Sequence, residues 1–295
     1  MKASILGGNG YIGKHMAFYL HNLEWDLAVY DIQEKFAGNF VVPYFQLDIS
    51  KKDQLGNFDF DCDYLFFFIG LTGTDISFEK FNDFININEI GLLSFLTEIS
   101  KINKKPKIIF PSTRLVYKGI KGVKLAEDAE KEFKTIYASS KYNGELYLEM
   151  YKAMFNINYT IFRICIPYGN LFDKGSYGTV SFFLDKALNK QPITLYGDGS
   201  LKRTFSHVLD ICKQMIEVCK QSESDGECFN IDGETYSLDE IATYFGKKYG
   251  VDVQYVEWPE KAWRLESGDT IFNSEKIKNL LKTPLTFNVK EWINL

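Results

Sequence analysis

The amino-acid sequence predicts an α/β protein, in which a doubly wound parallel sheet is followed by a smaller C-terminal domain. Short apolar runs alternate with longer helix-like segments over the first 170 residues, as expected of strands joined by crossover helices. The run YLFFFIG at 64–70 is apolar without a break, which is typical of a strand buried on both faces. The glycine-rich turn GGNGYIG at 7–13 separates the first apolar run from the first helix-like segment.

The expected elements follow this alternation along the chain. The predicted strands of the sheet are bounded by turn residues and lie at 3–8, 26–31, 43–49, 64–70, 107–113 and 159–165. The helix-like segments between them are 11–23, 79–101 and 135–155. After about residue 170 the pattern loosens, with helices expected at 179–190, 208–221 and 238–249. We therefore predict one domain over 1–170 and a smaller one over 171–295, some of whose segments return to the first.

The composition argues against several classes of function. The formal net charge of −5 and the lack of a basic stripe argue against a nucleic-acid partner. Five cysteines form no CxxC pair and only three histidines are present, so no metal site is expected. The longest apolar run, at 64–71, is too short to cross a bilayer, and no cleavable leader is evident. We expect a cytoplasmic protein with no membrane partner.

The glycine turn has the features of a dinucleotide site. Gly7, Gly10 and Gly13 fall at GxxGxxG spacing, where small residues permit a tight turn and close backbone approach to a pyrophosphate. Asp31 ends the second apolar run 18 residues after Gly13, where such a site needs a carboxylate for the adenosine ribose. An acid there would repel the extra phosphate of NADP, and no arginine follows it closely. The sequence therefore favours NAD over NADP.

A tyrosine and a lysine form a second candidate site. Tyr137 and Lys141 are four residues apart on a predicted helix, so both side chains project from one face. A free phenol, with a pKa of about 10, is a poor acid–base catalyst near neutrality, and a neighbouring ammonium would favour the phenolate. Ser112 and Thr113 end the preceding strand about 25 residues earlier, at the carboxyl edge where α/β sheets hold ligands. Either hydroxyl could bind an alcohol or a ketone at the reacting carbon.

Taken in order, these motifs resemble those of the extended short-chain dehydrogenase/reductases, in particular the NAD-dependent nucleotide-sugar epimerase/dehydratase family. The similarity runs through nearly the whole chain, and its most specific part is YGDGSLKRTFSHVLDI at 196–211. By this resemblance the sheet is a Rossmann-type domain that binds NAD, and the C-terminal domain binds the substrate. The cofactor-binding residues that it implies are Gly7, Gly10, Tyr11, Ile12, Gly13, Asp31, Asp48, Ile49, Gly70 and Lys141.

The resemblance also implies catalytic roles. Tyr137 is then the acid–base group, and Lys141 binds the nicotinamide ribose and tunes Tyr137. Thr113, which lies four residues before Tyr117, is the assisting hydroxyl, with Ser112 as the neighbouring alternative. The implied reaction begins with hydride transfer at a sugar carbinol carbon, commonly C4.

The implied partner is a nucleotide-diphosphate sugar. Arg203 would meet its diphosphate; Arg264 is a second candidate for that contact, with a surface role as the alternative. Tyr196, together with Tyr177 and Phe182, could line a pocket for the base or the sugar. The family likeness further suggests a homodimer, formed through the helices near 79–101 and 135–155.

Departures from the family pattern narrow the choice among the reactions that the family catalyses. Arg114 and Leu115 stand where the 4,6-dehydratases carry an acidic pair, so dehydration is disfavoured. Ile166 replaces the usual substrate-contacting asparagine, and Thr204 replaces the usual acid after the diphosphate arginine.

Three functions stay open at this point. The leading one is a nucleotide-sugar epimerase that retains NAD and acts reversibly at C4 of a UDP- or dTDP-sugar. The alternative is a 4-keto-6-deoxy-sugar reductase, which uses the same catalytic residues with an exchangeable NAD(P)H. The third is a non-catalytic NAD(P)-binding sensor, against which the retained Tyr137 and Lys141 argue.

Overall fold

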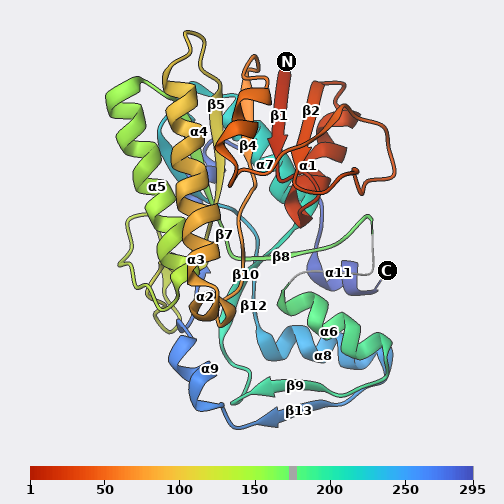
Figure 1. The fold of residues 1–295 in the computed structure, drawn as a ribbon. Helices are drawn as coiled ribbons and strands as arrows, with labels where there is room; N and C mark the ends of the chain where they lie inside the picture. Colours follow the sequence, from red (N-terminus) through yellow and green to blue (C-terminus); the bar gives the residue numbers. More distant parts are fainter. Residues whose placement is uncertain (173–177, 295) are drawn as a thin grey trace.

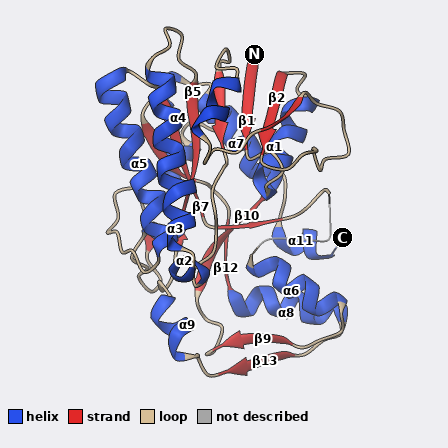
Figure 2. Ribbon diagram, in the orientation of Figure 1, coloured by secondary structure: helices blue, strands red, loops and turns tan. Residues whose placement is uncertain are grey.

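The computed structural model describes residues 1–172 and 178–294, and it confirms the predicted α/β fold (Figures 1 and 2). The main sheet is parallel, with the strand order β11-β7-β5-β4-β1-β2-β3. In this order the strands are β11 (Glu227–Asn230), β7 (Tyr159–Ile164), β5 (Lys107–Thr113), β4 (Tyr64–Phe67), β1 (Lys2–Leu6), β2 (Asp26–Asp31) and β3 (Tyr44–Gln46). The order reverses between β1 and β4, so the carboxyl ends of these two strands border the crevice in which such sheets bind ligands.

Helices cover both faces of this sheet. One face carries α1 (Tyr11–Asn22) and α7 (Val208–Cys219), and the other carries α4 (Gly91–Ser100) and α5 (Ile136–Phe155). In β4, Phe66 packs in the first hydrophobic cluster, whereas its neighbours Leu65 and Phe67 pack in the second. This strand is therefore buried on both faces, as its unbroken apolar run predicts.

The segment that was expected to form one helix over 79–101 is broken into shorter pieces. It begins with α2 (Ile76–Glu79) and α3 (Phe81–Phe84), passes through a π-helical turn at Ile85–Ile90, and continues as α4. Asn88 lies in the π-helical turn and is 3% exposed. Its side chain accepts a hydrogen bond from the Leu71 N–H (2.7 Å) and donates to the Ser140 hydroxyl (3.1 Å). The irregular turn thus presents an amide side chain to the end of β4 and to α5, which a regular helical pattern did not predict.

The C-terminal part of the chain forms a smaller unit beyond the carboxyl ends of the strands, toward which β1 and β2 point in Figure 1. Its mixed sheet contains β8 (Ile166–Tyr168), β10 (Lys202–His207) and β12 (Glu234–Ser237). Two parallel pairs complete its strands, β9 (Ile193–Tyr196) with β13 (Val253–Val256), and β6 (Lys124–Leu125) with β14 (Ile271–Phe272). Its helices are α6 (Thr179–Leu188), α8 (Leu238–Tyr249), α9 (Glu260–Leu265) and α11 (Val289–Asn294), whereas α10 (Glu275–Lys278) packs against β11 of the main sheet.

Helix α8 shows why local sequence fixes some of these bounds. The Ser237 hydroxyl accepts from the Glu240 N–H (3.1 Å) while the Glu240 carboxylate accepts from the Ser237 N–H (2.7 Å), which is a capping box. The helix ends at Gly250, whose φ of +65° suits a residue without a side chain. Strand β11 then shows chain crossing between the units, because it pairs with β7 of the main sheet. The boundary near residue 170 itself stays a prediction.

None of the helices in the described ranges combines the length and the hydrophobicity that a membrane crossing requires.

Candidate active site

The glycine turn joins β1 to α1 at the crevice. Gly7 has a φ of +79°, and a Cβ atom there would lie 2.8 Å from the backbone N of Ile69. A Cβ atom at Gly13 would lie 2.1 Å from the Gly7 carbonyl oxygen, and one at Gly10 would lie 3.1 Å from it. The three glycines therefore let the turn close on itself and on the end of β4, and bring the N-terminus of α1 to the crevice. Gly8 is equally constrained, because a Cβ atom there would lie 2.1 Å from the Val29 side chain.

Asp31 lies at the end of β2, beside this turn. Its carboxylate accepts hydrogen bonds from the N–H groups of Asn9 (2.9 Å) and Gln33 (3.2 Å), one on each oxygen. Each oxygen keeps a further lone pair, which is the arrangement that binding two ribose hydroxyls requires. Sequence reasoning missed Asn9, whose side-chain oxygen accepts from the Ala37 N–H at 2.8 Å and so shapes the loop after β2. The position of Asn9 between Gly8 and Gly10 of the motif was the sequence feature that could have identified it as part of the site.

The other proposed cofactor residues have local partners. The Tyr11 hydroxyl donates to the Gly169 carbonyl (2.5 Å), and Ile12 packs at the edge of the first hydrophobic cluster. Asp48 accepts hydrogen bonds from the hydroxyl (2.6 Å) and N–H of Ser50, which lower the pKa of its carboxyl group. Ile49 is 5% exposed and packs against α4. The contact of Asp48 and Ile49 with adenine stays a prediction.

Thr113 lies at the end of β5, and Tyr137 and Lys141 lie in the first two turns of α5. Helix α5 starts at Ile136 because the Thr135 side chain accepts from the Ala138 N–H (3.0 Å), so Tyr137 lies in its first turn. Burial raises the pKa of Tyr137 to about 12, while a hydrogen bond from Thr113 and the nearby charge of Arg114 act to lower it. The structure thus brings the Thr113 hydroxyl to the phenol, as the resemblance implied.

Lys141 lies one helical turn after Tyr137 and is 6% exposed. Burial lowers its pKa to about 8, against the opposing effect of Glu145. Its ammonium lies 4.4 Å from the centre of the Phe110 ring. A Cβ atom at Gly70 would lie 3.7 Å from this ammonium, so the backbone that follows β4 passes close beside Lys141. Asn88, the other residue that sequence reasoning missed, lies 3.3 Å from the same Cβ position.

Ser112 faces a different part of the molecule. Its hydroxyl donates to the carboxylate of Glu145, which is also paired with Arg163. Ser112 and Thr113 are neighbours on one strand, so their side chains point to opposite faces of the sheet. The geometry therefore favours Thr113 over Ser112 as the hydroxyl beside Tyr137.

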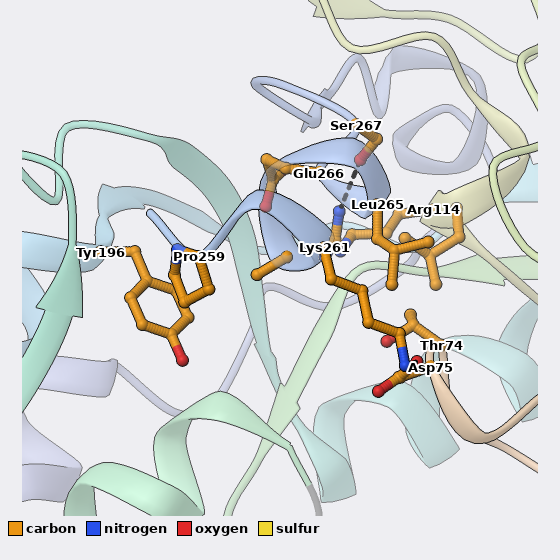
Figure 3. A pocket seen from close by; sticks show the side chains of 11 residues that line it. Thr74, Asp75, Arg114, Tyr196, Pro259, Lys261, Leu265, Glu266 and Ser267 are labelled. Atoms are coloured by element: carbon orange, nitrogen blue, oxygen red, sulfur yellow. Dashed lines mark hydrogen bonds and ion pairs between the residues drawn. The ribbon is translucent and has the colours of Figure 1, made fainter. Parts of the chain in front are cut away.

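A cavity of about 380 Å³ opens next to these residues (Figure 3). Arg114, which follows Thr113, lies on one side of it, and Tyr196 and Pro259 lie on the opposite side. Leu115 is also among the lining residues. Lys261 contributes a further cation, which pairs with Asp75 at 2.5 Å. The cavity extends from the end of β5 to β9, which gives room for a ligand that is longer than a single sugar ring.

The two arginines that are expected to bind a diphosphate have carboxylate partners within the protein, and their contact with a diphosphate stays a prediction. Arg203 is 1% exposed, donates to the Gly268 carbonyl (2.7 Å), and pairs with Glu266 (2.6 Å). Arg264 lies in α9 with its side chain 74% exposed, and it pairs with Glu260 one turn earlier. Neither lines the cavity, whereas Glu266 does. Tyr177 lies outside the described residues, and Phe182 is exposed on α6.

The residues fit a nicotinamide dinucleotide at the crevice. The glycines leave no Cβ atoms between the backbone and a pyrophosphate, and Asp31 offers carboxylate lone pairs. Lys141 lies beside Gly70, which follows the end of β4. A phenol, a threonine hydroxyl and a lysine ammonium in this arrangement can move a proton to and from an alcohol.

Comparison with known proteins identifies relatives of this chain in sequence and in fold. The UDP-N-acetyl-alpha-D-glucosaminuronate decarboxylase of Bacillus cytotoxicus is 28% identical over 254 residues, which cover 81% of this chain and 77% of that protein. The UDP-glucose 4-epimerase of Mycoplasma genitalium is 24% identical, with 99% of this chain and 94% of that protein covered. The crystal structure of the Thermotoga maritima UDP-glucose 4-epimerase with UDP-glucose is similar in fold, with a TM-score of 0.87 at 23% identity over 100% of this chain and 96% of that one.

The model of the NAD dependent epimerase/dehydratase family matches residues 3–232, a range that runs from β1 through β11. This match covers well over half of the chain and confirms the resemblance seen in the sequence motifs. The chain therefore belongs to the NAD-dependent epimerase/dehydratase family.

Proposed function

We propose that this chain is an NAD-dependent nucleotide-sugar epimerase that acts by reversible hydride transfer at C4 of a UDP- or dTDP-linked sugar. The observation that carries the proposal is the hydrogen bond between Thr113 and Tyr137, with Lys141 one turn later on the same helix. The cavity of about 380 Å³ begins at Arg114, the residue after Thr113. Relatives whose names record action on UDP-linked sugars support the substrate class.

The glycine turn and Asp31 would hold the adenosine and pyrophosphate of NAD, and Lys141 would hold its nicotinamide ribose. Bound NAD would supply a reversible hydride acceptor. Tyr137 accepts the proton of the C4 hydroxyl at its phenol oxygen, and Thr113 orients that hydroxyl by a hydrogen bond. The hydrogen bond from Thr113 and the positive charge of Arg114 favour the phenolate form that this step needs, because they oppose the rise in the Tyr137 pKa that burial causes. On the return step Tyr137 gives the proton back.

Water elimination has little support in the site. The two residues after Thr113 are a cation and an aliphatic side chain, and both line the cavity. Neither can act as a carboxylic acid toward a leaving hydroxyl, so the two positions after Thr113 supply no general acid for dehydration.

The test compares two reactions of the purified chain. UDP-glucose and UDP-galactose are incubated without added reduced cofactor, and a dTDP-4-keto-6-deoxy-hexose is incubated with NADH or NADPH. Interconversion of the hexoses without cofactor consumption is the expected result. Stoichiometric oxidation of NADH or NADPH with the keto-sugar would instead establish the reductase alternative. Failure of both reactions would argue against catalysis at this site.

We also propose that the chain forms a homodimer through α4 and α5, which lie side by side in Figure 1. Helix α5 exposes Met150 (60%) and Met154 (75%), and the neighbouring π-helical turn exposes Ile90 (47%). Met150 and Met154 are four residues apart and so lie on one face of α5, and exposed apolar side chains on one face are typical of a contact surface. Sedimentation analysis of the purified chain measures the state directly.

A further inference from the structure

The charges around the cavity leave one cation without a carboxylate partner. Lys261 pairs with Asp75 at 2.5 Å, and Glu266 pairs with Arg203 at 2.6 Å. Arg114 also lines the cavity, but within residues 1–172 and 178–294 no carboxylate forms an ion pair with it. The group of Arg114, Arg203 and Glu266 therefore carries a net charge of about +1.

The Arg114 guanidinium is held in place by one of its nitrogens. Nη1 donates to the hydroxyls of Ser267 (3.1 Å) and Thr270 (3.2 Å), and Figure 3 shows the first of these bonds at the cavity wall. Among the described residues, none accepts a hydrogen bond from Nε or Nη2. A guanidinium presents five donors in a fixed plane, so this arrangement leaves one edge available for a planar or tetrahedral oxyanion.

The surroundings of Arg114 make an anion favourable. Burial and the charge of Arg203 lower its pKa to about 10, which shows that the protein disfavours a lone positive charge here. The side chain still remains charged at neutral pH. An anion that entered the cavity would relieve this destabilisation and would be bound more strongly than in water.

From this geometry we propose that Arg114, rather than Arg203 or Arg264, binds an oxyanion of the substrate in the cavity. This inference rests on the proposed nucleotide-sugar substrate. Two groups of such a substrate share the required chemistry, the diphosphate and a carboxylate on the sugar ring. Arg203 acts behind Arg114 as a positioning residue, because it neutralises Glu266, whose charge would otherwise attract the Arg114 guanidinium and repel the ligand.

The experiment measures the affinity of the purified chain for UDP, dTDP, UDP-glucose and UDP-glucuronate by calorimetry. Arg114→Ala is expected to weaken binding of its target about 10- to 100-fold, the loss that follows when a charge-assisted contact is removed. If UDP or dTDP is weakened along with both sugar nucleotides, the oxyanion is the diphosphate. If only UDP-glucuronate is weakened, the oxyanion is the sugar carboxylate.

Two further variants keep the result interpretable. Arg114→Lys keeps the charge but not the planar fork, and it is expected to bind with intermediate affinity. Lys261→Ala removes a cavity cation that is already paired with Asp75, so it is expected to change affinity less than about threefold. Bound NAD content and the thermal midpoint show that each variant is folded.

Affinities in Arg114→Ala that stay within about twofold of the parent for all four ligands would overturn the assignment. An equal loss in Lys261→Ala would overturn it too, because the effect would then be general electrostatics. A parent chain that binds these ligands through Arg114 but converts no sugar would contradict the proposed function and leave the assignment standing.

Discussion

Replacing Glu145 by glutamine tests the buried ion pair behind the candidate active site. The Glu145 carboxylate accepts hydrogen bonds from Nε (3.0 Å) and Nη2 (2.5 Å) of Arg163, and the two side chains are only 6% and 5% exposed. The Ser112 hydroxyl donates to the same carboxylate. Glu145→Gln keeps the shape of the side chain but leaves the Arg163 charge buried without its counter-charge.

The expected loss in the free energy of unfolding is about 3 kcal/mol. Removing one partner of a buried pair destabilises a protein by about 3–5 kcal/mol. The lower end applies here because Arg163 Nη1 keeps its hydrogen bonds to the Tyr117 hydroxyl (2.7 Å) and the Glu127 carbonyl (2.7 Å). The same change removes the charge that raises the pKa of Lys141. Its pKa should therefore fall below about 8, and the alkaline limb of the pH–rate profile should move to lower pH.

Urea unfolding, followed by tryptophan fluorescence, measures the first effect, and kcat/KM from pH 6 to 10 measures the second. Glu149→Gln is the matched control, since Glu149 lies exposed one turn later on the same helix. It should change stability by no more than about 0.5 kcal/mol. If Glu145→Gln is destabilised no more than this control, the buried pair does not stabilise the folded chain.

Three further outcomes are expected. Tyr137→Phe should lower kcat for hexose interconversion about 10²- to 10⁴-fold with NAD content unchanged; activity equal to the parent would refute its acid–base role. Gly13→Ala places a Cβ atom 2.1 Å from the Gly7 carbonyl oxygen and should weaken NAD binding at least about tenfold in a fluorescence titration; unchanged affinity would show that the turn does not hold the pyrophosphate. The pKa of Lys141 is about 8 in the folded chain and 10.5 in the unfolded chain, so the unfolded chain binds more protons between these pH values. The free energy of unfolding of the NAD-free chain should therefore rise with pH over this range, by about 3 kcal/mol from this residue. Lys141→Met should lack this rise when urea unfolding is measured at pH 7.5 and at pH 10. An equal increase in the free energy of unfolding between these two pH values in the variant and the parent would contradict the prediction.

The parts of the fold that depend on local signals were predictable from the sequence. Helix α8 has the bounds expected from its periodicity, 238–249, because its capping box and its terminal glycine are neighbours in the chain. The buried strand β4 and the glycine turn were likewise read from runs of a few residues. The prediction of one continuous helix over 79–101 was wrong at the π-helical turn, where the side chain of Asn88 forms hydrogen bonds with Leu71 and Ser140. Those contacts join residues that are far apart in the sequence, so no periodicity records them.

The candidate site shows the same division. Tyr137 and Lys141 share a helix, so their spacing alone places them together. The pairing of Arg203 with Glu266 joins residues 63 positions apart. Sequence motifs identified Arg203 as a cation in the right region but could not show that its charge is already neutralised. The sequence marked Arg114 only as a departure from the family pattern. The structure adds that Arg114 lines the cavity.

The return of β11 to the main sheet has a consequence for the synthesis of this protein. Strand β7 has β11 as its outer neighbour, and Asn230 at the end of β11 holds the Tyr117 hydroxyl at 2.7 Å. A nascent chain that has emerged only as far as residue 170 therefore carries an unpaired sheet edge, which is prone to associate with other chains. The edge is covered only when residue 230 has left the ribosome, so the main sheet is completed only after part of the C-terminal half has been made.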